Sequence, residues 1–214
     1  MRSPTPAGLV QATSAGSTLH LNAGSIDNTT GRIVNVGAGN TSVAATGHIE
    51  SSGQIAGNGN VSLSADSLRN QAQGTVSAGG DMSLAVRASL DNAGTVSSAG
   101  ALQSNQTGLS LRNSGTVVAA GAIDLTAASV NNDGGKLATT QGSNASVLLN
   151  AQSVSNQGGT IMSDNKADLH VTGDLDNRGG LLQARTDLDL QSGGTVKNDG
   201  GNIEAVSPPP APCA

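Results

Sequence analysis

One stretch decides the fold: residues 169–190 read LHVTGDLDNRGGLLQARTDLDL. Apolar and polar residues alternate in it, as in Leu169-His170-Val171 and Leu188-Asp189-Leu190. Alternation at a period of two predicts short β-strands, each with one row of side chains pointing inward and one pointing outward. Gly, Asn and Asp cluster between the apolar segments and predict turns. No part of the chain shows the i, i+3, i+4, i+7 spacing of an amphipathic helix.

A short phrase, an aliphatic residue two positions before an asparagine, returns along most of the chain. From Asn28 to Asn198 there are eight steps with a mean period of about 21 residues, within the range of known solenoid repeats. One copy has Ser51 where the others have asparagine. A fixed period of this size predicts a solenoid, in which each unit buries its apolar face only by stacking on its neighbours. The repeated asparagines are Asn28, Asn70, Asn92, Asn113, Asn132, Asn156, Asn177 and Asn198.

We therefore predict an all-β fold, a parallel β-helix of about nine coils with three short strands per coil. Stacking at about 4.8 Å per coil would give a rod of roughly 40–45 Å. The chain contains no Phe, Tyr or Trp. A narrow coil can be filled by Leu, Val, Ile and Ala, whereas a globular core of this length usually contains aromatic residues. We expect the rod to be monomeric or to associate weakly through its ends.

Three segments are expected along the chain. Residues 1–16 contain Pro4 and Pro6 and are predicted to be unstructured or poorly ordered. Residues 17–206 form the β-helix, and residues 207–214 form a Pro-rich tail, because a proline run cannot pair in a sheet. The single cysteine, Cys213, excludes a disulfide framework. No apolar run is long enough for a signal peptide or a membrane helix, so no membrane insertion is predicted.

The asparagines and the glycines that follow them predict a structural turn ladder. Asparagine tolerates the left-handed backbone conformation, and its amide can bond to nearby backbone or to the same residue in the next coil. A glycine two residues later allows positive φ without steric cost. The alternative is that this row binds a ligand. The glycines at this position are Gly94, Gly115, Gly134, Gly158, Gly179 and Gly200.

Residues suited to catalysis or metal binding are few. His20 and His170 are expected at equivalent outward positions many coils apart, so they read as surface histidines, as does His48. Four carboxylates predict a solvated acidic face, because the known calcium-loop patterns are missing. No nucleophile elbow, phosphate loop or zinc-protease motif occurs. We therefore predict no enzyme activity, no catalytic residue, no metal and no cofactor. The four carboxylates are Asp174, Asp176, Asp187 and Asp189.

Charge argues against one class of partner. The chain has ten basic and fifteen acidic residues and a net charge of -5. Binding to nucleic acid relies on an excess of Lys and Arg facing the phosphates. No nucleic-acid partner is therefore predicted.

The repeat phrases resemble a known family. Residues 91–96, 155–161 and 176–182, each with its Asn-x-Gly or Asn-x-Gly-Gly turn, are similar to the haemagglutinin repeats of filamentous haemagglutinin and its relatives. Those relatives are giant exoproteins of Gram-negative bacteria that are exported by two-partner secretion. The resemblance implies a right-handed parallel β-helix, a location that is secreted or at the bacterial cell surface, and a role in attachment and virulence. The family's secretion domain carries Asn-Pro motifs, and none occurs here, so the chain resembles mid-shaft.

From this resemblance we expect a structural shaft segment of a filamentous adhesin, which projects a distal binding domain for host-cell attachment. The implied partners of the parent protein are the host-cell surface or neighbouring bacteria, together with an outer-membrane secretion partner. Two alternatives stay open. One is a receptor- or glycan-binding module within the β-helix itself. The other is the shaft of a contact-dependent growth-inhibition protein that delivers a toxin.

Overall fold

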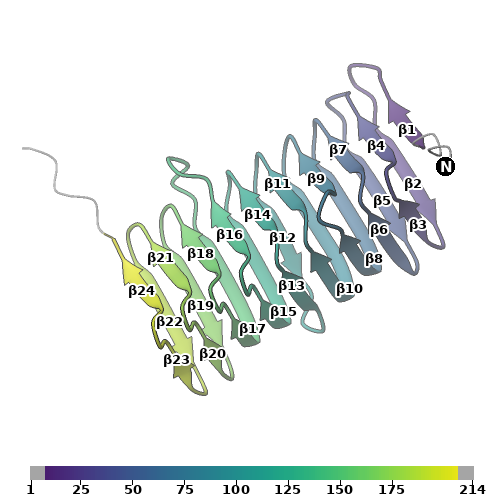
Figure 1. Ribbon diagram of the computed structural model, residues 1–214. Helices are drawn as coiled ribbons and strands as arrows, with labels where there is room; N and C mark the ends of the chain where they lie inside the picture. The colour runs from purple at the N-terminus through teal and green to yellow at the C-terminus, as the bar shows by residue number, and fades with distance from the viewer. Residues whose placement is uncertain (1–7, 207–214) are drawn as a thin grey trace, which may run out of the picture.

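The computed structural model describes residues 8–206, which form a stack of β-coils without a helix (Figure 1). The strands of consecutive coils lie side by side and pair in parallel, for example β15 (Ile123–Asn131) with β17 (Val147–Ser155). The predicted all-β parallel β-helix is therefore confirmed.

One sheet holds ten strands, which are β1 (Leu9–Ala12) ahead of the first coil and then one strand from each of the nine coils. Neighbouring strands in this sheet are separated in sequence by strands of the other sheet, so every connection is a crossover. In spatial order the strands are β1 (Leu9–Ala12), β4 (Arg32–Asn35), β7 (Gln54–Gly57), β9 (Thr75–Ala78), β11 (Thr95–Ser98), β14 (Thr116–Ala119), β16 (Lys136–Thr139), β18 (Thr160–Ser163), β21 (Leu181–Ala184) and β24 (Asn202–Ala205).

The other sheet holds fourteen strands and supplies two segments to each coil. In four coils the two segments are fused into one long strand, as in β10 (Met82–Asn92), whose pairing with the preceding coil shifts register between Val86 and Ser89. In the other five coils the segments are separate strands. Nine coils with three strand segments each are thus present, as predicted. The fused strands are β8 (Val61–Asn70), β10 (Met82–Asn92), β15 (Ile123–Asn131) and β17 (Val147–Ser155). The separate pairs are β2 (Leu19–Ala23) with β3 (Ile26–Asn28), β5 (Thr41–Ala45) with β6 (His48–Ser51), β12 (Leu102–Asn105) with β13 (Ser110–Asn113), β19 (Ala167–Val171) with β20 (Leu175–Asp176), and β22 (Leu188–Ser192) with β23 (Val196–Lys197).

The core is a set of apolar rows that run along the rod. Leu63, Leu84 and Leu125 occupy the same register position in successive coils, with Ser104 between the last two, and all four side chains are buried. The aliphatic residue two positions before each asparagine forms a second row, in which only Val196 of the last coil is exposed. Each inward side chain packs against its copies above and below, and this is why no coil could bury its apolar face alone.

The structure corrects one predicted boundary. Residues 9–12 were expected within a poorly ordered segment, but they form β1, which pairs with β4 over four residues. Leu9 to Ala12 are held as a strand by backbone pairing with the edge of the sheet. Their sequence shows too little alternation of apolar and polar residues for a strand to be predicted from it alone. Residues 1–7 and the Pro-rich tail at 207–214 lie outside the described residues.

Candidate functional site: the asparagine corner

The repeated asparagines line one corner of the rod, where the second segment of each coil turns toward the ten-stranded sheet. All of them except Asn198 in the last coil are buried. A buried amide must find hydrogen-bond partners, because an unpaired one costs about 1–3 kcal/mol. The partners of these side chains therefore define what the corner does.

The side-chain amides bond to one another along the rod. From Asn70 to Asn198, each Nδ2 donates to the Oδ1 of the asparagine in the next coil, at 2.7 or 2.8 Å. Asn156 Nδ2 also donates to the carbonyl oxygen of Leu181 in the next coil at 3.0 Å, and to that of Gly159 in its own turn at 3.3 Å. One amide thus links its own turn, the next asparagine and the next strand.

The row is interrupted at Ser51. Asn28 Nδ2 donates to Ser51 Oγ at 3.0 Å, which ends the short first run. Asn70 Oδ1, in the coil after Ser51, is buried and accepts no hydrogen bond among the described residues. The serine side chain is shorter than asparagine and carries no amide donor, so it does not pass the interaction on.

A row of glycines stands beside the asparagines, and sequence reasoning missed it. Each of these glycines directly precedes a strand of the ten-stranded sheet, and a Cβ on most of them would collide with backbone of the preceding coil. At Gly159, for example, the clash would be with the carbonyl oxygen of Asn132. The sequence does contain this pattern. The glycine has a fixed position relative to the strand that follows it, whereas its distance from the preceding asparagine varies. The row contains Gly31, Gly53, Gly74, Gly94, Gly115, Gly135, Gly159, Gly180 and Gly201.

The glycines expected at positive φ fall into two groups. Gly134, Gly158, Gly179 and Gly200 have φ between 60° and 66°, and a Cβ there would meet open space or one distant atom. Gly94 and Gly115 do not have positive φ, so the expectation was wrong for these two. Their turns contain one residue fewer, and this places them in the close-packed row described above.

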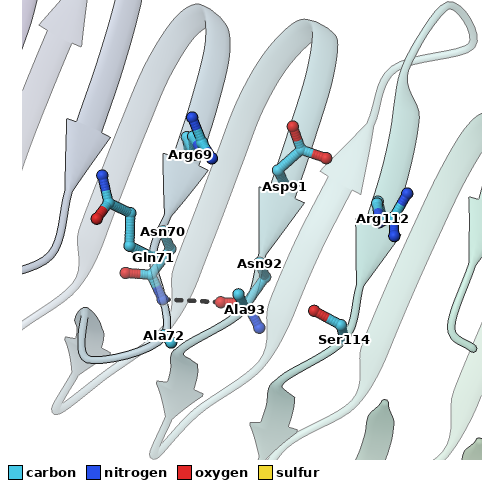
Figure 2. A pocket seen from close by; sticks show the side chains of 9 residues that line it. All are labelled: Arg69, Asn70, Gln71, Ala72, Asp91, Asn92, Ala93, Arg112 and Ser114. Carbon is cyan, nitrogen blue, oxygen red and sulfur yellow. Dashed lines mark hydrogen bonds between the residues drawn. The ribbon is translucent and has the colours of Figure 1, made fainter. Parts of the chain in front are cut away.

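The shortened turns create a recess in the corner (Figure 2). In two successive coils a single residue, Ala93 or Ser114, separates the asparagine from the glycine of the close-packed row. In the coil that precedes these two, three residues, Gln71 to Gln73, occupy the same turn. The resulting recess has a volume of about 520 Å³. Its rim carries Arg69, Asp91 and Arg112, which are register partners in three successive coils.

The charges of this recess are only partly paired. Arg69 lies 3.7 Å from Glu50 of the preceding coil. Within the described part of the chain, neither Asp91 nor Arg112 forms an ion pair. Figure 2 shows both side chains directed away from the Asn70–Asn92 bond. The recess can therefore offer a guanidinium and a carboxylate to a polar ligand, but no apolar or aromatic platform.

The histidines are not brought together. His20 and His170 both point outward, but they lie in neighbouring rows and not, as had been expected, at equivalent positions. When the strand register is followed from coil to coil, the position of His20 corresponds to Asp168, whereas His170 pairs with Asn150 and Gln191. No group of three or more His, Cys, Asp or Glu able to hold a metal occurs among residues 8–206.

The two perturbed carboxylates nearest the C-terminal end are held by local hydrogen bonds. The Arg178 side chain donates to Asp176, which keeps the pKa of that carboxyl below its ordinary value. The backbone N–H of Asn144 donates to Asp164 at 2.7 Å and lowers the pKa of that carboxyl in the same way. Asp164 is buried beside the 140–146 loop, so its charge fixes the loop against the rod. Both groups serve the fold locally, and neither forms part of a convergent site.

This geometry defines a class, a parallel β-solenoid whose coils are joined by stacked side-chain amides. The haemagglutinin repeat family model matches residues 9–55, 38–110, 97–152 and 140–205, and so covers nearly all of the described chain. The chain belongs to the haemagglutinin repeat family, as the sequence resemblance indicated. Comparison with curated proteins and with solved structures gives no match. Within residues 8–206, no helix has the length and apolar character needed to cross a membrane.

Proposed function

We propose that this shaft-type segment belongs to a secreted or surface-exposed filamentous adhesin, and that it projects a distal binding domain for host-cell attachment. The observation that carries the proposal is the unbroken stack: the same inward rows and parallel pairing run from β2 to β22. Such a stack adds a fixed length per coil, which suits a spacer. An outer-membrane secretion partner for the parent protein belongs to the same proposal.

The surface of the middle coils supports a spacer role. Between Val36 and Val196, Leu148 is the one large hydrophobic residue that is exposed, at 38%. Strong protein interfaces usually depend on aromatic or arginine anchors in desolvated pockets. The chain has no aromatic residue, and between Val36 and Val196 the outward face offers no continuous apolar patch for a partner.

We also propose that the segment has no enzymatic activity. Ser25 Oγ lies 3.2 Å from His48 Nδ1, which resembles the start of a nucleophile–base pair. The pair is exposed, however, and among the described residues no carboxylate accepts a hydrogen bond from His48. Without an orienting group and an enclosed pocket, the serine is not activated.

Attachment assays with the isolated chain test the proposal. Beads coated with the 214-residue chain should bind epithelial cells no better than beads coated with an inert protein. A parent protein should keep its attachment when Asp124 on the outward face is changed to serine. Specific binding by the isolated chain, or loss of attachment in Asp124→Ser without loss of stability, would reject the spacer role.

The recess at the asparagine corner favours a second candidate, a receptor- or glycan-binding module. Arg112 and Asp91 have no ion-pair partner among the described residues and could bind an acidic or hydroxylated ligand. Arg112→Ala should then abolish binding to immobilised glycans, while the matched outward change Asp124→Ser leaves it intact. If neither the unmodified chain nor the Asp124→Ser variant bound any glycan on an array, this candidate would be rejected. A shaft that delivers a growth-inhibiting toxin would behave like the first proposal in both assays, but its parent would act on neighbouring bacteria.

A further inference from the structure

One line of outward side chains on the second strand segments carries an ordered series of charges. These residues directly precede the asparagines, or Ser51, and they stand in register from coil to coil. Five in succession are charged, in the order negative, negative, positive, negative, positive, and the next two are uncharged. We call this line the charged row. In coil order it contains Asp27, Glu50, Arg69, Asp91, Arg112, Asn131 and Ser155.

A line of small residues runs beside the charged row. It lies two residues earlier in each strand, it is also in register, and we call it the serine row. Figure 2 shows Arg69, Asp91 and Arg112 on neighbouring strands, directed away from the asparagine ladder. Because a serine side chain is short, the charged groups project beyond the serine row and would be the first to meet an approaching surface. The serine row contains Ser67, Ser89, Ser110, Ser129 and Ser153.

We propose that this face binds the same face of a second copy, with the two rods antiparallel and a two-fold axis between β8 and β10. The proposal does not depend on the function proposed above. In such an isologous contact every pair of residues occurs twice. Arg69 of one copy faces Asp91 of the other, because the axis exchanges these two coils. Glu50 of one copy likewise faces Arg112 of the other, so four contacts between opposite charges form.

The order of the charges selects this alignment over its neighbours. An axis placed on β10 would bring the two copies of Asp91 together and set Arg69 against Arg112. An axis one coil nearer the N-terminus would set Asp27 against Asp91. An axis one coil nearer the C-terminus would leave Arg69 opposite the uncharged Asn131. Opposite charges favour a contact and like charges oppose it, so the axis between β8 and β10 is preferred.

The serine row decides the direction of the rods. A two-fold axis that runs across the rods keeps serine row on serine row, so the charged rows of the two copies also meet. With parallel rods the axis would run along them and exchange the two rows. The charged row would then lie over serines, and no ion pair would form. Antiparallel pairing is therefore the arrangement in which the charges contribute.

Side-chain length and the edge of the face agree with this pairing. Facing sheets lie about 10 Å apart. Each contact in the charged row joins a long arginine to a shorter carboxylate, and arginine can bond a carboxylate through two N–H groups. At the edge of the face, Arg87 Nη2 lies 2.6 Å from Asp66 Oδ1 within one rod. These two residues belong to the exchanged coils β8 and β10, so the axis sets each near the oppositely charged residue of the other copy.

The contact is polar, so the dimer should be weak and sensitive to salt. Ion pairs between exposed groups contribute little each, and dissolved salt screens them. The facing serine rows leave room for water, which often bridges polar groups across such interfaces. We therefore expect association only at high protein concentration and low ionic strength.

Charge reversals in separate chains test the pairing. Sedimentation velocity of the 214-residue chain in low salt, followed by refractive index because no aromatic residue is present, should show a coefficient that rises with concentration. Arg112→Glu or Glu50→Arg alone should weaken the association by roughly tenfold, because each sets like charges opposite one another. An equal mixture of the two variants should associate like the parent, since every charged contact between the two different chains is again attractive.

Lys136→Glu is the matched control, because it makes the same change of charge at an exposed position of the ten-stranded sheet and should associate like the parent. Arg69→Glu mixed with Asp91→Arg is a second complementary pair. It repeats the test without removing the hydrogen bond that Gln71 donates to Glu50. Circular dichroism shows whether each variant is folded. A parent chain that stays monomeric at every concentration in low salt, a folded single variant that associates like the parent, or a mixture that associates no better than its components would overturn the proposal.

Distances between spin labels measure the direction of pairing. In a Cys213→Ser background, Ser129→Cys and Ser153→Cys each place one label on the serine row, outside the charged stretch. The axis separates the two copies of the Ser129 label by five coil spacings and those of the Ser153 label by seven. With about 4.8 Å per coil and about 10 Å between the sheets, the distances should be about 26 Å and about 35 Å. Parallel rods would give equal distances at the two sites, and that result would overturn the antiparallel arrangement.

Discussion

The coils around Ser51 and the coils from Asn132 to Asn198 share one fold but differ at the asparagine corner. In the later coils the amides form an unbroken series at 2.7 or 2.8 Å. Around Ser51 the series stops, and Asn70 Oδ1 is left buried without a donor from the described residues. The strands nevertheless pair without a register shift through Ser51, both with β3 and with β8.

This difference separates two contributions to the stack. Register is kept where the ladder is broken, and the aliphatic row remains complete there, with Ile49 buried between Ile26 and Leu68. A one-residue slip would turn every inward side chain outward, so the apolar rows alone specify the alignment of the coils. The asparagine ladder adds stability to a corner that is already aligned.

The largest expected effect tests the apolar rows in both regions. Leu125→Asp in the later part and Leu63→Asp nearer Ser51 would each bury an unpaired charge, at a cost of several kcal/mol. Both side chains are at most 1% exposed. Thermal melts followed by circular dichroism should show loss of the cooperative transition in both variants. The outward neighbour change Asp124→Ser should shift stability by less than about 0.5 kcal/mol. Similar melts for Leu125→Asp and Asp124→Ser would refute the inward assignment.

The glycine row is common to both regions, so its substitution should be costly in each. Gly159→Ala would force a methyl group into the Asn132 carbonyl and should cost about 3 kcal/mol, and Gly53→Ala should behave alike against Gly31. Gly158 is the matched control, because its φ is +60° but the space around it is open. Gly158→Ala should cost only about 1–2 kcal/mol. Chemical denaturation measures all three, and a larger effect at Gly158 than at Gly159 would contradict the packing argument.

The ladder itself should matter more where it is continuous. Asn156→Ala removes three donated hydrogen bonds and leaves Asn177 Oδ1 without its donor, for a loss of about 2 kcal/mol. Ser51→Ala removes one acceptor and should cost about 0.5–1 kcal/mol. Denaturation midpoints of the two variants give the comparison directly. Equal losses would mean that the additional hydrogen bonds of Asn156 add no measurable stability, and this would contradict a stabilising ladder.

Repairing the break should stabilise the protein. Ser51→Asn sits in a short turn like that of Asn92 and would supply a donor to Asn70 Oδ1, for a gain of about 1 kcal/mol. Asn92→Ser is the reverse change in a matched turn and should lose a similar amount. If Ser51→Asn melted below the parent, the ladder would be poorly tolerated in these coils rather than merely absent.

The smallest expected effect concerns another polar atom of the same early region. Thr41 Oγ1 is buried and lacks a hydrogen-bond partner among the described residues. Thr41→Val keeps the shape of the side chain and removes the unpaired hydroxyl, so it should gain about 0.5–1 kcal/mol. Thr139→Val is the control, because Thr139 Oγ1 accepts from Asp164 N at 2.7 Å and its loss should destabilise. A destabilised Thr41→Val would mean that this hydroxyl is satisfied in solution.

Sequence periodicity was enough to predict the coils because two independent periods agree. The alternation within Leu169-His170-Val171 fixes which side chains face inward, and the regular return of the Asn-x-Gly phrase from coil to coil fixes the stacking. The same reasoning failed at β1, where four residues on a sheet edge depend on their neighbour β4 rather than on their own pattern. Local sequence cannot report a contact with a strand that belongs to the next coil.

The corner could be predicted only in part. Asparagine spacing suggested side-chain contacts, but the turn length between asparagine and glycine varies, as between Asn70 and Gly74 or Asn92 and Gly94. Counting forward from asparagine therefore merged two different glycine roles. The recess beside Arg112 was also invisible, because it arises from turns that are short relative to their neighbours in space.

The strands lie across the rod, so the hydrogen bonds between coils run along its axis. Tension applied through the two ends of the chain would therefore load one terminal coil at a time and peel it away, rather than shear all coils together. Each coil, at the repeat length of the sequence, would release about 70 Å of extended chain. A stretched molecule should lengthen in a series of small, nearly equal steps that begin at an end. The rod would thus yield gradually under a pull while resisting bending, as a shock-absorbing tether does.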